Sequence, residues 1–398
     1  MLTFEVTPLS HDYLDYLTCH EEVSHPSLQS KPLIGIFINR FDSLALLDNI
    51  SNKKIRLLVD ANEDLNNKLV FFSLIDIDFD NKRIFGHYYN QEGQHWEKEN
   101  FPYPEIIYQI GSGLKKEKNL FKRFQEEMKQ FGARFINPLQ SFDKWTTYKH
   151  LQKYPKIASY LPSTTVLNDQ EDLKTMLGKY QSVYLKPIGG RKGKRILRID
   201  QNYNRYKILT YHKNPNSIPV NNFCELIDHV FDFVRSKNSY IIQETIDLLS
   251  IDAKLIDLRA EVQRNGTGKL KITAIPVRLG KSNSPITQHV DSYKFTEFFT
   301  SIWKLPDKDL ADLYSSLITL ITNVYESIEA LHGKCGEMGI DIAVDKNLQL
   351  YLIECNSKPT KASLLRAYGE QTLIDFYKEL LQYASISINN GNQCLDDA

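Results

Sequence analysis

Residues 341–356 read DIAVDKNLQLYLIECN, two apolar runs separated by the turn-forming residues 345–347. This pattern predicts two antiparallel strands, in which side chains alternate between the two faces of a sheet. Glu354 and Asn356 are two residues apart and therefore point the same way. Asp341 lies on the partner strand, where it can meet them. Two carboxylates and one amide oxygen are hard ligands of the kind that magnesium prefers.

The alternative is a pair of ordinary strands whose polar residues face solvent. Leu350, Leu352 and Ile353 make the second strand apolar on both faces. A Glu and an Asn inside such a strand need polar partners or a metal ion, because burying them alone is costly. From these residues alone, a metal site and a structural polar pair both remain open.

A glycine-rich basic stretch lies upstream, where residues 184–194 read YLKPIGGRKGK. A strand that ends near Lys186 leads into Gly189, Gly190 and Gly193, which let backbone amides approach an anion closely. It is not a Walker loop, because no Lys-Ser/Thr pair follows the last glycine. A basic flexible hairpin is the alternative interpretation.

Three further cations come from other parts of the chain. Arg259, in Asp257-Leu-Arg259, and Arg278 lie in strand-like contexts, where a buried guanidinium must find an anion. Structural salt bridges explain many buried arginines, so that alternative also stands. Lys144 lies near a helix start that Ser141 can cap; taken alone, it is a surface residue.

Composition narrows the classes of function. Lys plus Arg and Asp plus Glu both total 49, so the formal net charge is zero, which disfavours nucleic acid as the main partner. No stretch approaches the roughly 18–20 apolar residues of a membrane span, so no membrane partner is expected. Five scattered cysteines and no secretory signal predict a cytoplasmic protein with reduced thiols.

The pattern of apolar runs and turns predicts an N-terminal strand-rich domain over 1–140, then segments 141–238 and 239–388, and a disordered tail over 389–398. A polar stretch at 215–222, with two prolines, is interpreted as a surface loop. The predicted strands are 33–38, 68–77, 82–89, 104–108, 183–185, 195–197, 207–211, 240–243 and 270–279, and the predicted helices are 114–131, 308–332 and 372–383.

The order of these motifs resembles the ATP-grasp superfamily over residues 141–370. The closer match is the YheC/YheD family of endospore coat-associated ATP-grasp proteins. FFSLIDID at 71–78 and FPYPEIIY at 101–108 resemble its N-terminal segment, and GID at 339–341 and IECNSKP at 353–359 resemble its C-terminal signature. Two departures, Thr360-Lys361 after that signature and a glycine-poor stretch at 282–295, both concern the substrate end.

The resemblance implies an α/β (α+β) fold: an ATP-grasp fold in which two α+β subdomains, 141–238 and 239–388, enclose ATP behind the N-terminal domain. It implies that Lys144 and Lys186 contact phosphates and that Gly189, Gly190 and Gly193 form a lid. Gln243, Glu244 and Ile246 would read adenine in a hinge. The implied catalytic residues are Arg259, Lys186 and Arg278, and Asp341, Glu354 and Asn356 would bind one or two Mg2+ ions, or Mn2+ in their place.

The implied activity is a carboxylate–amine ligase that consumes ATP through an acyl phosphate. Its expected partners are ATP, a small-molecule or peptide carboxylate and an amine, with self-association left open. The alternatives are a small-molecule kinase and a non-catalytic nucleotide-binding protein of the spore surface. The resemblance adds spore association to the expected cytoplasmic location.

Overall fold

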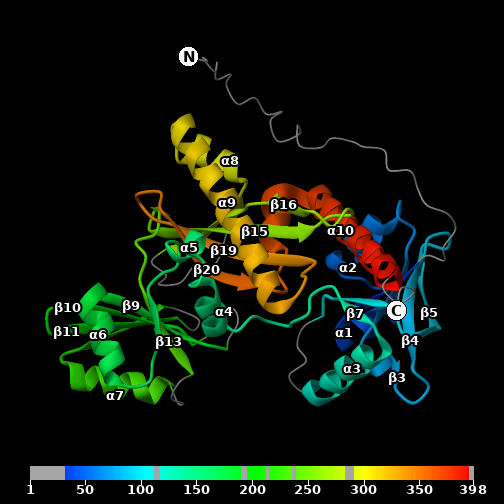
Figure 1. The fold of residues 1–398 in the computed structure, drawn as a ribbon, viewed down its shortest axis with the longest axis horizontal. Helices are drawn as coiled ribbons and strands as arrows, with labels where there is room; N and C mark the ends of the chain where they lie inside the picture. The colour runs from blue at the N-terminus through cyan, green and yellow to red at the C-terminus, as the bar shows by residue number, and fades with distance from the viewer. Residues whose placement is uncertain are drawn as a thin grey trace. The chain divides into compact units, whose positions relative to one another are not determined.

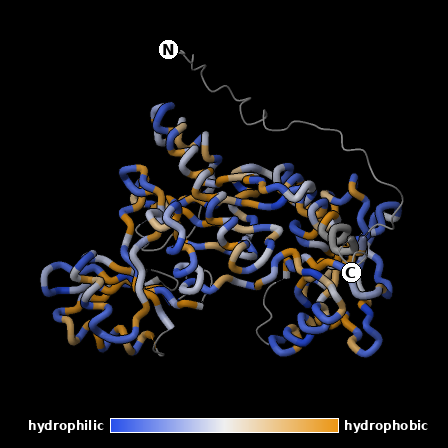
Figure 2. The backbone as a smooth tube through the Cα atoms, in the orientation of Figure 1, coloured by the Kyte–Doolittle hydropathy of each residue, from blue (hydrophilic) through white to orange (hydrophobic). Residues whose placement is uncertain are grey.

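The computed structural model describes residues 32–111, 117–189, 195–211, 215–234, 239–282 and 291–393. Within these residues the chain forms three sheets, each with helices packed against it (Figure 1). Hydrophobic residues concentrate along the strands and hydrophilic residues at many of the turns (Figure 2). None of the helices in this part of the chain is both long and apolar enough to cross a bilayer.

The first sheet has the strand order β3-β4-β2-β1-β6-β7, with β5 paired to β4. Ile34 and Ile36 of β1 face a core shared with α2 and α10, whereas Phe37 faces α3 and stacks on Phe124 at 5.5 Å. β1 is therefore buried on both faces, as its continuous apolar run predicts. The elements are β1 (Leu33–Phe37), α1 (Arg40–Leu47), α2 (Lys53–Asn62), β2 (Lys68–Phe72), η2 (Leu74–Asp76), β3 (Ile77–Asp78), β4 (Arg83–Asn90), β5 (His95–Pro102), β6 (Ile106–Gln109), α3 (Lys118–Phe131) and β7 (Arg134–Phe135).

The carboxyl ends of β1 and β6 mark a turning point in the first sheet. β1 pairs in parallel with β2 on one side and with β6 on the other. The chain therefore leaves these two central strands in opposite directions, which makes a topological switch point where open parallel sheets bind ligands.

The second sheet is antiparallel throughout, in the order β12-β11-β10-β9-β13-β8. Helices α6 and α7 cover it, and Leu173 and Leu226 are fully buried in their shared core. Two short helices, α4 and α5, lie between the first and second sheets in the chain. The elements are α4 (Lys144–Leu151), α5 (Pro155–Ala158), β8 (Thr164–Val166), α6 (Gln170–Tyr180), β9 (Ser182–Pro187), β10 (Leu197–Asn202), β11 (Arg205–Tyr211), β12 (Pro215–Val220), α7 (Phe223–Val234) and β13 (Tyr240–Glu244).

The third sheet, also antiparallel, has the order β18-β17-β15-β19-β20, with β14 and β16 paired to β15. The apolar stripe of α9, which includes Leu317 and Val324, packs on it, as the period of apolar residues over 308–332 predicts. Helix α10 packs beside α2 on the first sheet and also contacts β15, β16 and β18 of the third sheet (Figure 1). The elements are β14 (Ser250–Ile251), β15 (Lys254–Arg264), β16 (Leu270–Ala274), β17 (Val277–Ser282), β18 (Asp291–Tyr293), α8 (Phe295–Glu297), η4 (Phe298–Ile302), α9 (Asp307–His332), β19 (Glu337–Val344), β20 (Leu350–Asn356) and α10 (Ala362–Gln393).

Five local predictions are wrong. The strand predicted over 68–77 ends at Phe72 and is followed by the 3-10 helix η2 and the short strand β3. Residues 215–220 form strand β12 rather than a loop, because prolines are tolerated on an edge strand. The strand predicted over 270–279 is two strands, separated at Ile275-Pro276. The strand predicted at 195–197 begins only at Leu197. The cap of α4 is Asp143, whose carboxylate accepts from the Thr146 amide at 2.7 Å, and not Ser141.

Gly111, just beyond β6, should not tolerate a side chain. A Cβ there would lie 2.5 Å from the carbonyl carbon of Ile38 and 2.7 Å from the amide nitrogen of Asn39, both backbone atoms. We expect Gly111→Ala to lower the free energy of unfolding by about 1–3 kcal/mol in urea titrations. The control is Gly178→Ala in helix α6, where nothing lies within 4 Å and a gain of about 0.5–1 kcal/mol is expected. Equal effects of the two substitutions would contradict the close approach.

Candidate functional site

The acidic residues of the quoted stretch meet on two neighbouring strands. Asp341 of β19 lies directly opposite Glu354 of β20, and Gly339 lies opposite Asn356. Glu354 and Asn356 therefore share one face, as their two-residue spacing predicts. The register shifts between Asp341 and Ile342, which leaves Ile353 as an extra residue in β20. Such a bulge re-aims the side chains beside it.

Two arginines neutralise the acid at the centre of this face. Arg259 of β15 lies opposite Asp341 and donates to both of its carboxylate oxygens, one of them at 3.0 Å. Arg278 of β17 donates to Asp257 at 2.5 Å and lies 3.0 Å from Asp341 Oδ1. Burial opposes the charge of Arg259, but Asp341 together with Glu261 and Asp257 outweighs it and raises the arginine pKa, so the guanidinium stays protonated. Both predicted arginines are thus at the site, and both hold acids.

Two lysines approach the same acids from the second sheet and from α4. Lys144 follows the cap residue Asp143, and its ammonium lies 2.9 Å from Glu354 Oε1. Lys186, in β9, donates to Gln243 Oε1 at 2.5 Å. Burial of the ammonium lowers the pKa of Lys186 to about 8; Lys144 adds to this effect and Glu354 opposes it. The electrostatic influence of Glu354 places Lys186 in the same charge cluster.

The residues predicted to form a hinge lie at the end of β13, where the chain leaves the second sheet. Gln243 donates to Thr164 Oγ1 at 2.9 Å, and the Glu244 carboxylate accepts from the Ser163 amide at 2.8 Å. Ile246 follows in the connection to the third sheet. Gln243 also holds Lys186, so this hinge is tied directly to the cationic side of the site.

The structure describes only part of the predicted lid and of the substrate stretch. Gly189 lies two residues beyond the end of β9 and is exposed. Gly190 and Gly193 lie outside the described residues, as do residues 283–290 of the glycine-poor stretch.

The face that results carries oxygen donors next to cations. Among the described residues, no three His, Cys, Asp or Glu side chains gather closely enough to hold a metal by themselves. Asp341 and Glu354 carry two carboxylates, and Asn356, whose amide nitrogen donates to Asp341 Oδ2 at 3.3 Å, carries an amide oxygen as a third potential ligand. This donor set fits Mg2+, which takes few protein oxygens and keeps water or phosphate for its other positions.

Sequence patterns did not predict a buried charge network that lies beneath the site. Lys361 lies 2.9 Å from Glu261 and 2.8 Å from Glu337, and all three side chains are at most 4% exposed. Glu261 lies 3.8 Å from Arg259, and Glu337 accepts from the Tyr108 hydroxyl at 3.1 Å. Acids and bases therefore alternate from Asp341 down to the first sheet.

Strand periodicity could have revealed half of this network. Glu261 lies two residues after Arg259 and so shares its face of β15. Lys361 carries no such signal, because it lies outside any strand, just before α10 begins.

Comparisons with known proteins agree with this architecture. A family model described as YheC/D like ATP-grasp matches residues 132–386. The endospore coat-associated protein YheD of Bacillus subtilis (strain 168) is 23% identical over 337 residues, which cover 83% of this chain and 73% of that protein. YheC of the same organism is 22% identical over 316 residues, covering 76% and 84%. The crystal structure of D-alanyl-alanine synthetase A from Vibrio cholerae O1 biovar eltor str. N16961 is similar with a TM-score of 0.52 and 12% identity, covering 89% of this chain and 99% of that one. The predicted ATP-grasp fold, of the α+β class, is confirmed.

The buried network gives a stability prediction. Lys361→Met should lower the free energy of unfolding by roughly 3–5 kcal/mol, because it removes the cation that lies between the buried acids Glu261 and Glu337 and leaves Glu261 only the more distant Arg259. Lys271→Met is the matched control: this lysine of β16 pairs with Glu379 of α10, but its side chain is 40% exposed, so a loss below about 1 kcal/mol is expected. Urea titration of both variants at neutral pH makes the comparison. A small loss for Lys361→Met would show that the network is not stabilised by this lysine.

Proposed function

The chain belongs to the YheC/D-like ATP-grasp family, and from this membership we propose that it is a ligase that uses ATP to join a carboxylate to an amine. The observation that carries the proposal is the meeting of Glu354 with Lys144, since it brings an acid of the third sheet against a cation from outside that sheet. Such a pair of opposite charges is suited to holding the phosphates of a nucleotide together with their counter-ion.

The nucleotide would lie between the second and third sheets. Lys144 and Lys186 would contact its phosphates, and the loop that begins at Gly189 would cover them. Gln243, Glu244 and Ile246 would contact adenine, because they lie where the chain crosses from one sheet to the other. Gln243 would have a second role, since its carbonyl holds the Lys186 ammonium in place.

Asp341, Glu354 and Asn356 would hold one or two magnesium ions, with manganese as a substitute. Bound there, the metal would supply positive charge against the phosphate oxygens. Lys144 now neutralises Glu354 and the two arginines neutralise Asp341, so these cations would be free to turn toward phosphate once another positive charge faces the acids.

The reaction would depend on the positioning of ATP and the two substrates, and no protein side chain would act as a nucleophile. A substrate carboxylate oxygen attacks the terminal phosphorus of ATP, and the bond to ADP breaks. The amine nitrogen then attacks the acyl carbon, phosphate leaves, and the nitrogen loses a proton. Arg259 and Arg278, fixed by acids on neighbouring strands, would stabilise the negative charge on the transferring group.

The substrate class is proposed as an amino acid, a peptide or a related small carboxylate. The relatives YheD and YheC are named as endospore coat-associated proteins. We therefore propose that this chain acts in the cytoplasm of a cell that forms spores, or in association with the spore.

Removing Glu354 tests the activity. With Mg-ATP and a panel of amino acids and dipeptides, the wild-type protein should release ADP and phosphate and form a product whose mass fits an amide. Glu354→Ala should lower the rate by about 100-fold or more, as loss of a group that organises transition-state charge does.

The control for this test is Glu370→Ala, which removes an exposed partner of Lys53 and should leave the rate unchanged. Unchanged ATP consumption in Glu354→Ala would overturn the site assignment. A product that retains phosphate would identify a kinase, and an absence of turnover with intact Mg-ATP binding would favour the non-catalytic alternative.

The lowered pKa of Lys186, about 8, predicts how ATP affinity changes with pH. Below pH 8 the ammonium is charged and attracts phosphate, whereas above pH 8 the free protein loses this charge. The dissociation constant for Mg-ATP should therefore rise by up to about tenfold per pH unit above 8. Calorimetric titrations from pH 7 to pH 9.5 would measure it. In Lys186→Arg the guanidinium stays protonated, so the rise should be absent. A rise of the same size in both proteins would exclude Lys186 as its source.

A further inference from the structure

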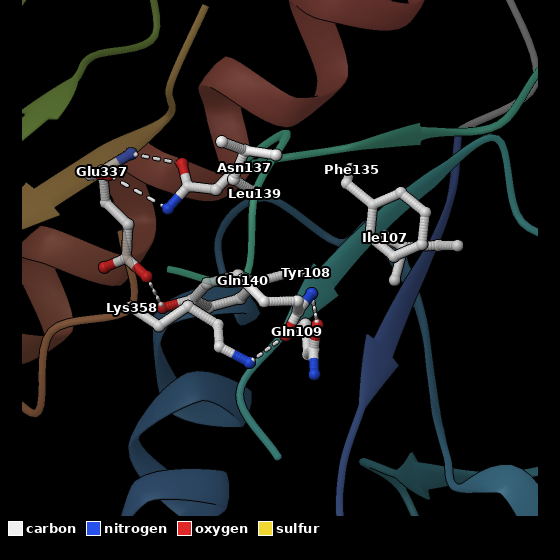
Figure 3. A pocket seen from close by; sticks show the side chains of 9 residues that line it. All are labelled: Ile107, Tyr108, Gln109, Phe135, Asn137, Leu139, Gln140, Glu337 and Lys358. Atoms are coloured by element: carbon white, nitrogen blue, oxygen red, sulfur yellow. Dashed lines mark hydrogen bonds between the residues drawn. The ribbon is translucent and has the colours of Figure 1, made fainter. Parts of the chain in front are cut away.

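Three polar side chains form a chain of hydrogen bonds at the junction of the first and third sheets (Figure 3). Lys358, two residues after Asn356, donates from Nζ to Gln140 Oε1 at 2.5 Å. Gln140 donates from Nε2 to Gln109 Oε1. Gln109 is the last residue of β6, so the chain runs from the end of the acidic motif to the carboxyl edge of the first sheet.

The lysine fixes the direction of every bond in this chain. An ammonium can only donate, so the Gln140 atom that faces it must be the carbonyl oxygen. The Gln140 amide nitrogen then faces Gln109, whose facing atom must in turn be its own carbonyl oxygen. Gln109 Nε2 is therefore turned away from Gln140, as Figure 3 shows, and it can only donate.

Among the residues that the structure describes, this terminal donor has no hydrogen-bond partner. Gln109 is 7% exposed, and its Nε2 is buried without a hydrogen bond. A buried amide left unsatisfied costs about 1–3 kcal/mol, so such a group needs an explanation. Gln109 also lines a cavity of about 10 Å3, together with Gln140, Lys358, the acid Glu337, the polar residues Tyr108 and Asn137, and the apolar residues Ile107, Phe135 and Leu139. A space of that size admits one water-sized atom.

We propose that Gln109 Nε2 binds a carboxylate oxygen of the compound on which the enzyme acts. The Lys358 charge polarises both amides in sequence, which strengthens the final N–H and favours an acceptor with negative charge. The position agrees, because Gln109 ends β6 at the switch point with β1, where ligands of parallel sheets bind. The proposal rests on the ligase function only for the identity of the ligand as a substrate.

The test follows the side-chain amide of Gln109 by 15N–1H NMR in the full-length protein, with sodium acetate as the probe. The Gln109 signals are assigned by their absence in Gln109→Glu, or in Gln109→Met if the first variant does not fold. Acetate up to about 100 mM, enough to detect weak millimolar binding, should shift these signals saturably. Sodium chloride and methylammonium chloride at equal ionic strength should not. Absence of a shift, or an equal shift with chloride, would overturn the proposal and leave a buried water only.

Three variants sharpen the test, with the Gln140 side-chain signals as the reporter. Gln109→Glu replaces the donor by an acceptor of the same shape and should weaken acetate binding by about 10- to 100-fold. Gln152→Glu makes the same change at an exposed glutamine at the end of α4 and should have no effect. Lys358→Met frees both amides to turn and should weaken binding as well. Unchanged binding in Gln109→Glu or in Lys358→Met would contradict the directed chain.

Acetate binding requires neither ATP nor turnover. A protein that binds acetate at Gln109 but forms no amide would refute the ligase function and leave the carboxylate site standing. Amide formation with no response of Gln109 to acetate would support the ligase function and refute the carboxylate site.

Discussion

The contact between Arg259 and Asp341 is the constraint on which the rest of the structure depends. It joins two central strands of the third sheet at one register position, and it buries a charge that neither residue could carry alone. Around it the other ionic groups must alternate in sign. Arg278 and Asp257 continue the pattern on one side, and Glu261 and Lys361 continue it beneath. The acids and cations of the site are therefore positioned by one another before any ligand arrives.

Much of this could be predicted from the sequence where a short-range pattern carries the information. The apolar run of β1, the amphipathic helix α9 and the shared face of Glu354 and Asn356 are read from spacing alone. Periodicity fails where a tertiary contact decides. Residues 215–220 look like a loop because of their prolines, yet they form an edge strand, where prolines cost little. The roles of the site residues follow from resemblance to a family, and their geometry adds only that they meet.

What sequence could not give is the set of long-range partners. Lys361 pairs with residues about 100 and 24 positions away, and no local pattern marks it. Gln109 and Gln140 look like ordinary polar residues until Lys358 is found beside them. Of the two residues that depart from the family pattern, Thr360 is exposed, whereas Lys361 belongs to the charged interior. Helix α10, which starts there, carries this link onto the first sheet.

The extra residue in β20 has a consequence for how related sequences should be compared. Leu350 and Leu352 face the core beneath α9, and so does Cys355, although an uninterrupted alternation would put Cys355 on the opposite face. Before Ile353 the side chains that face the core are the even-numbered ones, and after it they are the odd-numbered ones. A protein with the same hairpin but without the extra residue in its second strand would carry the counterpart of Glu354 one position nearer the turn. An alignment of the two is correct only if it opens a gap inside a strand, the place where alignment methods least readily accept one.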